Sequence, residues 1–561
     1  MIIIISVVFA LAVIALAASL ENRIRVAAPI LLVLVGLGMS LVPAMPHIEV
    51  EPDWIIAGIL PPLLYSASAS MPTMDFRREI TTISGLAVLL VVATSFTLGL
   101  FFWLLIPDLN FALAVALGAI ISPTDAVATS IVKKLGVSSR VTTQLDGEGL
   151  FNDATALTIL RSALVASSAA IGFFSVLGQF LFAVIAAIII GAVIGGLSLR
   201  LRSRVEDPAV NTLISFLVPF AASIPAELLG ASGLVAAVVA GLMVSAGAAQ
   251  WLRPEHRSSD KETWHVIELV FEGAIFFTMG LQLTSVLEGV LEENAGLTLA
   301  VWCSIGAVVI TLLVRAIYAM FLTYNARKKF EQSSNFKDAA TALEHSDDAE
   351  EIQAVIVQIR GGRELPQNKK RNHKHKDFEN LSERSKQRLY RRRENMIKRI
   401  RQLGTSIRYQ FERPLTWRHS VVLVWAGMRG AVTLAAAQTI PEGTPQRSLL
   451  IFIAFLVALF SLVVQGGTLG LLVRWIKPEG DDPALREKEQ AALRKLTHDI
   501  VEKLTSSEES AQLSRLEVIH AQRQALLEAR EIGSYSSAVL TEELERLDAF
   551  EISFNLSEKR E

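Results

Sequence analysis

The sequence lacks the features that stabilise small secreted domains and those that build familiar enzyme centres. Its one cysteine, Cys303, lies in an apolar stretch, so the chain cannot form an intrachain disulfide. It contains neither the His-Glu-x-x-His pattern of zinc peptidases nor the Gly-x-Ser-x-Gly turn of serine hydrolases. These absences argue against an intramembrane enzyme, and the sequence predicts no cofactor.

Charged residues are also scarce. They make up 19% of the chain, against about 25% in an ordinary soluble domain, and 52% of the residues are hydrophobic. Apolar stretches of about twenty residues recur as far as Trp475, and each is long enough to cross a hydrocarbon core of about 30 Å. In lipid such stretches must be helices, because only helices satisfy their own backbone polar groups.

The pattern therefore predicts an all-α polytopic membrane protein with about thirteen transmembrane helices. The expected spans are residues 2–20, 27–43, 54–70, 81–105, 111–132, 142–166, 172–199, 209–226, 231–248, 263–283, 297–323, 416–439 and 447–475. The first span could be mistaken for a signal peptide, but it has no basic segment before it and further spans follow at once.

Basic residues gather in every second loop between these spans. Residues 133–140 and 200–204 carry three each, whereas the loops 107–110 and 167–171 carry none. Cytoplasmic loops hold the excess of Lys and Arg, so we expect the N-terminus outside and the C-terminus in the cytoplasm of a bacterial inner membrane.

Two polar segments complete the predicted domain order. Spans 1–11 occupy residues 1–323, a basic cytoplasmic insert follows at 324–415, spans 12 and 13 occupy 416–475, and a helical cytoplasmic tail fills 476–561. Within the insert, Lys369–Arg401 holds fourteen Lys and Arg against four Asp and Glu. We expect this patch to contact anionic lipid or a regulator, and no nucleic-acid motif supports nucleic-acid binding.

The first candidate site is the run Ser122-Pro123-Thr124-Asp125 inside the fifth span. Pro123 has no N–H and clashes with the preceding turn, so it should break the helix. A carboxylate beside such a break is a plausible cation ligand, since an ionisable group within a span is a functional hypothesis by default. The alternative is an ordinary helix start capped by Asp125.

The second candidate site lies in the sixth span. Asp153 falls about 16 Å along a helix that begins near Thr142, close to the bilayer middle. Glu148 and Asn152 are four residues apart and share one helix face. The small residues nearby leave room for another helix or an ion.

The third feature is Arg429 in the glycine-flanked run Gly427-Met428-Arg429-Gly430, where a helix break is again expected. A buried arginine needs a carboxylate, and we expect Glu148 to supply it in a structural ion pair. Arg315 is a second buried cation and an accessory candidate. The sequence leaves open whether the remaining charges in spans act in function or only snorkel or form structural pairs; these are Arg161, Glu268 and Glu272.

Taken together in this order, Leu60-Pro61-Pro62, Ser122–Asp125, Glu148 with Asn152-Asp153, and Gly427–Gly430 resemble the monovalent cation:proton antiporter family, in the branch of bacterial sodium/proton antiporters and animal sodium/proton exchangers. The resemblance covers roughly residues 1–475. It implies a homodimer and inverted repeats with two broken, crossed helices, in which a core moves like an elevator against a fixed dimerisation domain.

The resemblance also implies roles for particular residues. Asp125 and the pair Asn152-Asp153 match the family's ion site, and Glu148 with Arg429 matches its structural ion pair. Because a small cation prefers hard oxygen ligands, we also expect Thr124 to contribute to the ion site. An asparagine before the aspartate is the family's mark of electroneutral exchange. Two positions depart from the pattern, since Ser66 stands where many members have Glu, and Gly149 where some have Ser.

We therefore expect Na⁺ and protons to compete for the carboxylates of Asp125 and Asp153, which gives electroneutral Na⁺/H⁺ antiport. The departures at Ser66 and Gly149 leave K⁺ or Li⁺ open as the exchanged cation. A cation channel and a membrane sensor are rival interpretations. A channel would need no proton coupling, and a sensor would act through the insert and the tail.

Overall fold

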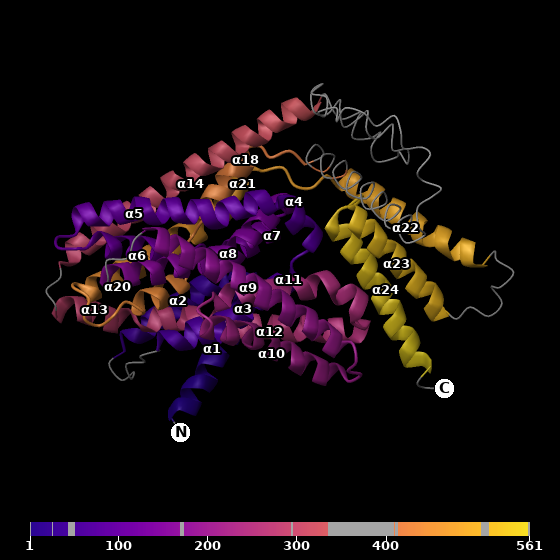
Figure 1. The fold of residues 1–561 in the computed structure, drawn as a ribbon, viewed down its shortest axis with the longest axis horizontal. Helices are drawn as coiled ribbons and strands as arrows, with labels where there is room; N and C mark the ends of the chain where they lie inside the picture. The colour runs from indigo at the N-terminus through magenta and orange to yellow at the C-terminus, as the bar shows by residue number, and fades with distance from the viewer. Residues whose placement is uncertain are drawn as a thin grey trace, which may run out of the picture. The chain divides into compact units, whose positions relative to one another are not determined.

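The computed structural model describes residues 2–24, 26–42, 51–168, 173–292, 296–334, 405, 409, 413–505 and 515–558 (Figure 1). All regular structure in these ranges is helical, which confirms the all-α prediction. The chain divides into two compact units: unit 1 comprises Met1–Leu322 and Thr416–Gly480, and unit 2 comprises Thr323–Leu415 and Asp481–Glu561. The basic run Lys369–Arg401 lies outside the described residues, so its predicted contacts stay a prediction.

Unit 1 begins with two separate helices and continues with three further helical stretches and one broken one. Its elements up to residue 168 are α1 (Ile2–Ile24), α2 (Ala28–Ser40), η1 (Trp54–Ile59), α3 (Leu60–Ser70), α4 (Thr73–Ser84), η2 (Gly85–Leu90), α5 (Val91–Leu105), α6 (Phe111–Ile121), α7 (Val127–Lys134) and α8 (Ser139–Ser168). The η elements are π-helical turns that continue into the next α-helix without a break.

Among the described residues, the second part of unit 1 carries six α-helices before the predicted insert, and four α-helices and one π-helical turn after it. They are α9 (Phe173–Arg202), α10 (Pro208–Leu228), α11 (Gly233–Trp251), α12 (Pro254–Leu281), α13 (Leu283–Glu292), α14 (Leu297–Ser334, whose end passes into unit 2), α18 (Trp417–Trp425), α19 (Val432–Gln438), α20 (Arg447–Phe460), η3 (Ser461–Gly466) and α21 (Gly467–Ile476).

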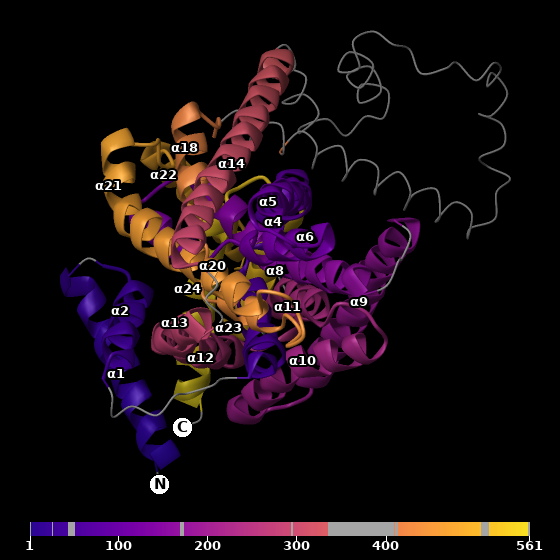
Figure 2. The ribbon, with the colours of Figure 1, turned by 90° about the vertical axis from the view of Figure 1, so that its left-hand side faces the viewer.

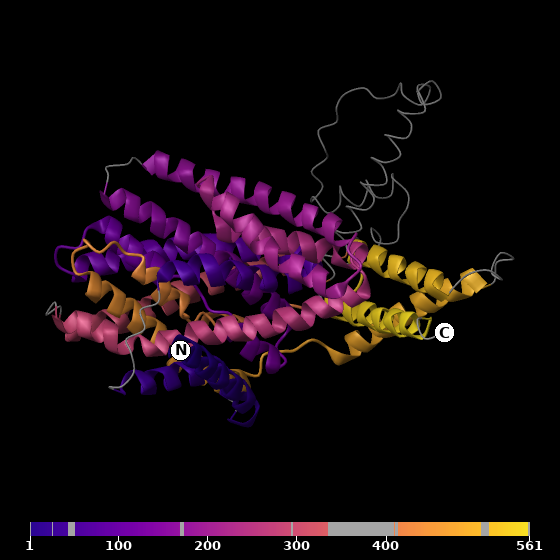
Figure 3. The same ribbon diagram turned by 90° about the horizontal axis from the view of Figure 1, so that it is seen from below.

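Most long helices of unit 1 run along one common direction, as Figure 3 shows. Figure 2 places α1 and α2 on one flank of the unit and α9 and α10 on another. Helix α11 packs against α9 and α3, whereas α6 packs against α5 and α8. Nine of the eleven residues of α6 are buried, so this apolar helix lies in the interior.

Seven helical stretches in the described residues are long and apolar enough to cross a membrane. They are Thr73–Leu105, Leu177–Arg202, Pro208–Leu228, Gly233–Trp251, Pro254–Glu292, Leu297–Ala326 and Arg447–Ile476, and four shorter apolar helices accompany them. A polytopic protein is therefore confirmed, while the count of thirteen spans stays a prediction.

Two of the expected spans are not continuous helices. The fifth, at 111–132, consists of α6 and α7 separated by Ser122–Ala126, and the twelfth, at 416–439, consists of α18 and α19 separated by Ala426–Ala431. Both predicted breaks are confirmed. The third span stays helical through Pro61-Pro62. The two prolines stand in the first turn of α3, directly after the π-helical turn η1, where their missing N–H groups are tolerated.

Unit 2 contains a three-helix tail formed by α22 (Pro483–Thr505), α23 (Arg515–Ile532) and α24 (Ser537–Glu558), each packed against the other two. Leu493, Leu526 and Leu540 form part of its core and are almost fully buried. The chain just before α18 joins this unit: the Thr405 hydroxyl donates to the Ile532 carbonyl at 3.0 Å, and Tyr409 is buried.

Candidate cation site

The two helix breaks meet inside unit 1. The backbone N–H of Asp125, in the first break, donates to the carbonyl of Met428, in the second, at 2.8 Å. The Asp125 carboxylate accepts from the N–H of Val127 at 2.9 Å and so caps the start of α7. A methyl group at Gly430 would lie 1.6 Å from an Asp125 carboxylate oxygen, so only glycine fits this crossing.

Helix α8 brings a second set of polar side chains to the same crossing. Asn152 is buried and donates through Nδ2 to both the side-chain and the carbonyl oxygen of Thr124, the latter at 3.3 Å. Thr124 in turn donates to Glu148 at 3.2 Å. The residues assigned to the ion site from sequence are thus brought together, with Asn152 acting as a tie between α8 and the first break.

Asp153 is buried and its carboxylate is incompletely hydrogen-bonded. The residue is only 7% exposed, and within the described residues its Oδ1 atom has no hydrogen-bond partner. A buried carboxylate oxygen without a partner is costly in free energy, and such atoms are uncommon in folded proteins. Asp125, by contrast, is only partly buried.

Both aspartates line one cavity of about 370 Å³. Its polar lining also includes Thr124, Thr129, Lys133, Asp146, Glu268 and Glu272, and Gly149 in the lining faces open space. The cavity thus offers the hard oxygen ligands that small monovalent and divalent cations prefer. Among the described residues, no group of three or more His, Cys, Asp or Glu is arranged to hold a resident metal ion.

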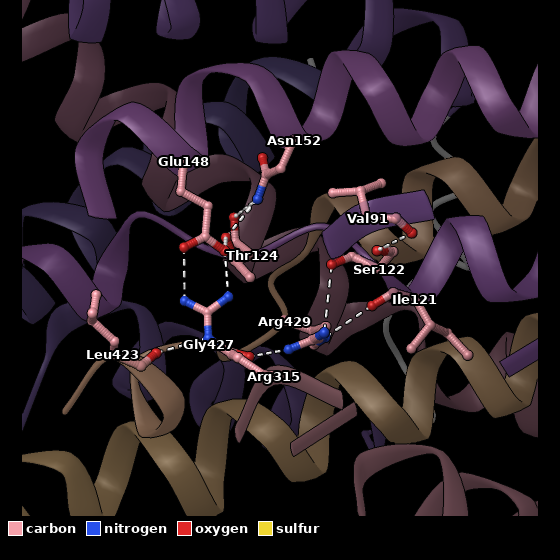
Figure 4. A network of polar contacts seen from close by, with 10 residues as sticks. All are labelled: Val91, Ile121, Ser122, Thr124, Glu148, Asn152, Arg315, Leu423, Gly427 and Arg429. Carbon is pink, nitrogen blue, oxygen red and sulfur yellow. Dashed lines mark hydrogen bonds and ion pairs between the residues drawn. The ribbon is translucent and has the colours of Figure 1, made fainter. Parts of the chain in front are cut away.

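The predicted ion pair between Glu148 and Arg429 is wrong, because Arg315 takes the carboxylate instead (Figure 4). Arg315 comes from α14 and binds both oxygens of Glu148, one of them through Nη2 at 2.7 Å, while its Nε donates to the Leu423 carbonyl at 2.7 Å. Both side chains are almost fully buried, so the two-pronged geometry compensates their loss of hydration.

Arg429 is instead satisfied by backbone carbonyls. Its guanidinium donates to Ile121 at 2.9 Å, to Ser122 and to Gly427 (Figure 4). These carbonyls lie at the C-terminal ends of α6 and α18, where the helix dipole is negative. The positive charge of Arg429 therefore balances the negative ends of two half-helices, and its guanidinium needs no carboxylate partner.

The structure also places charged residues whose role the sequence left undecided. Arg161 forms a 3.4 Å ion pair with Glu227, and its own side chain is 58% exposed, which fits a structural pair at the surface. Ser66 donates to Glu268 at 2.6 Å beside the cavity. Sequence reasoning missed Ser461, whose hydroxyl accepts from the Arg429 N–H at 2.8 Å; a serine in an apolar run carries no signal of such a role.

Comparisons with known proteins identify the family of the chain. The family model described as sodium/hydrogen exchanger, transmembrane, matches residues 8–337 and 400–475. An uncharacterised Na⁺/H⁺ exchanger of Mycobacterium tuberculosis is 26% identical over 85% of this chain and 75% of its own length. A sodium, potassium, lithium and rubidium/H⁺ antiporter of Bacillus subtilis is 28% identical over 56% of this chain and 49% of its own.

Among solved structures, the fold is similar to that of the sodium/proton antiporter MjNhaP1 of Methanocaldococcus jannaschii. The TM-score is 0.54 at 15% sequence identity, and the match covers 85% of this chain and 99% of the other. At this identity the likeness concerns the fold alone.

Proposed function

The chain belongs to the sodium/hydrogen exchanger family, and from that membership and the geometry of the helix crossing we propose that it exchanges Na⁺ for H⁺ across a membrane. The observation that carries the proposal is the buried, unpartnered carboxylate oxygen of Asp153, which lines the same cavity as Asp125. A carboxylate in that setting is stable only when it holds a proton or a cation.

Competition for the two aspartates couples the two fluxes. Na⁺ takes oxygen ligands from Asp153, Asp125 and water, and one proton replaces it on the same carboxylates. The two carboxylates carry one unit of negative charge when either ion is bound and two units when the site is empty. Moving the empty site through the membrane interior is costly, so the protein changes orientation only when loaded.

The surrounding charges support an electroneutral cycle. Glu148 is neutralised by Arg315 and Arg429 by helix ends, so neither needs to change its charge when the ion binds. Asn152 stands next to Asp153 and positions Thr124 without adding a charge. We infer an exchange of one Na⁺ for one proton, as the resemblance to the family implies.

The proposal extends to the location and assembly of the protein. We place it in the bacterial cell membrane with its N-terminus outside and its C-terminus in the cytoplasm, on the alternation of basic loops. The cavity reaches Lys133 and Pro72, which border loops on the predicted cytoplasmic side. This structure then represents an inward-facing state, and a homodimer supplies the fixed part against which the core moves.

K⁺ and Li⁺ remain the alternative cations. The name of the Bacillus subtilis relative includes both, and Ser66 and Gly149 alter the oxygen ligands near the site. Cation size and hydration decide the preference, and the transported ion has to be identified by experiment.

The test is a dye measurement of the pH gradient in proteoliposomes that contain the purified protein. We expect Na⁺ to collapse the gradient, with no effect of clamping the voltage, and Asp153→Asn to abolish the response while the protein still inserts. Collapse by K⁺ or Li⁺ alone would keep the mechanism and change the substrate. Activity in Asp153→Asn would refute the site, and cation flux that depolarises vesicles without moving protons would indicate a channel.

A further inference from the structure

A second wall of the cavity carries acids that the exchange mechanism has not used. Helices α3 and α12 line it through Leu63, Leu64, Glu268, Glu272, Ile275 and Phe276, whereas Asp125 and Asp153 belong to the first break and α8. We call these residues of α3 and α12 the α3–α12 wall. A transported ion that occupies the cavity is therefore exposed to carboxylates from both sets of helices.

Glu268 and Glu272 lie four residues apart on α12, so they share one helix face with Ile275 and Phe276. Like charges at this spacing destabilise a helix, and an acid within an apolar span is costly by itself. Such a pair persists in a membrane when a basic side chain, a proton or a cation compensates it.

Within the described residues neither glutamate forms an ion pair, and Lys133, Lys134 and Arg315 are each bound to another acid. Lys133, which also lines the cavity, pairs with Asp146 at 2.8 Å, and Lys134 pairs with Glu21 at 2.6 Å. Arg315 is bound to Glu148.

The two glutamates differ in their hydrogen bonds. Ser66 donates to Glu268 at 2.6 Å, at the position where the sequence departs from the family pattern by lacking an acid on α3. Helix α12 thus places a carboxylate beside the serine. Glu272 has no hydrogen bond within the described residues, and its side chain lines the cavity.

We propose that Glu272 is a second binding station for the transported monovalent cation, and that Ser66 and Glu268 position and support it. The cation passes between this station and Asp125 with Asp153, whose unpartnered Oδ1 lines the same cavity. The station raises the local concentration of cation and sets the apparent affinity and the choice among Na⁺, Li⁺ and K⁺. This inference rests on the proposed exchange function.

The test compares Glu272→Gln with Glu262→Gln, which removes an exposed acid from the same helix outside the cavity. In the proteoliposome assay we expect Glu272→Gln to raise the KM for Na⁺ about tenfold, to change kcat by less than about twofold, and to shift the Li⁺/Na⁺ preference. Glu262→Gln should match the wild type. Glu268→Gln and Ser66→Ala should raise the KM about threefold, and Ser66→Thr should restore it.

The outcomes separate this inference from the exchange function itself. A wild type that exchanges Na⁺ while Glu272→Gln keeps its KM and its cation preference overturns the second station and leaves the exchange function standing. A wild type that moves no proton in response to any cation overturns both. If Glu272→Gln does not fold, Glu272→Asp decides: an intermediate KM supports the station, and a wild-type KM refutes it.

Discussion

Two arginines are buried in the same part of unit 1, and they are satisfied by different means. Arg315 binds a carboxylate through two hydrogen bonds, whereas Arg429 binds only backbone carbonyls at the ends of two half-helices (Figure 4). Arg315 comes from the continuous helix α14, and Arg429 stands within a break. One arginine thus balances the helix ends at the crossing, and the other balances the carboxylate of Glu148.

The difference separates two roles that sequence reasoning had combined in one pair. Glu148 and Arg315 tie α8 to α14, and through Thr124 the same carboxylate reaches the first break. Arg429 holds the carbonyl ends of α6 and α18 together. Within the described residues, neither arginine forms an ion pair with Asp125 or Asp153.

Of the changes considered, Arg315→Ala should destabilise the protein most. The change leaves Glu148 buried without a partner, which should lower the free energy of unfolding by about 3–5 kcal/mol. A thermal unfolding measurement in detergent checks this. Replacing Glu148 and Arg315 together, by Leu and Met, should cost less than Arg315→Ala alone; a double variant that is the less stable of the two would contradict the pairing.

Arg429→Met should have a smaller effect on stability, because it leaves no carboxylate unpaired. It does leave the carbonyls of Ile121 and Ser122 without their donor, which should lower the free energy of unfolding by about 2–3 kcal/mol. The same unfolding measurement compares it with Arg315→Ala. If Arg429→Met proves the more destabilising change, and adding Glu148→Gln rescues it, then the carboxylate belongs to Arg429 after all.

Ser461→Ala should give the smallest change. It removes the hydroxyl that accepts from the Arg429 backbone N–H and donates to the Gln465 side chain at 2.6 Å, for a loss of about 1–2 kcal/mol. Thermal unfolding again measures the loss, with the wild type as the reference. A Ser461→Ala variant as stable as the wild type would show that this bond does not hold the second break.

Local residues were enough to predict the helix breaks and the acids of the site. Pro123 removes a backbone donor, the glycines around Arg429 weaken the helix, and a carboxylate in an apolar span is conspicuous. The partner of Glu148 could not be predicted in this way, because two buried arginines are equally suited by charge. The choice depends on how α14 and the second break pass α8, which only three-dimensional packing determines.

The same limit applies to the α3–α12 wall. Glu268 and Glu272 were visible as acids in an apolar span, yet nothing local could distinguish a surface position from one beside the cavity. Ser66 was visible only as a departure from a family pattern. Its hydrogen bond to Glu268 joins residues 202 positions apart, and no spacing rule relates them.

The way in which unit 2 closes has a consequence for the order of biosynthesis. Thr405 finds its partner Ile532 only 127 residues later in the chain. A ribosome therefore synthesises α18 to α21 before the tail helix α23 that carries Ile532. Nascent chains that stop before α23 lack the carbonyl that accepts from the Thr405 hydroxyl, so unit 2 is completed only after the second break has been synthesised.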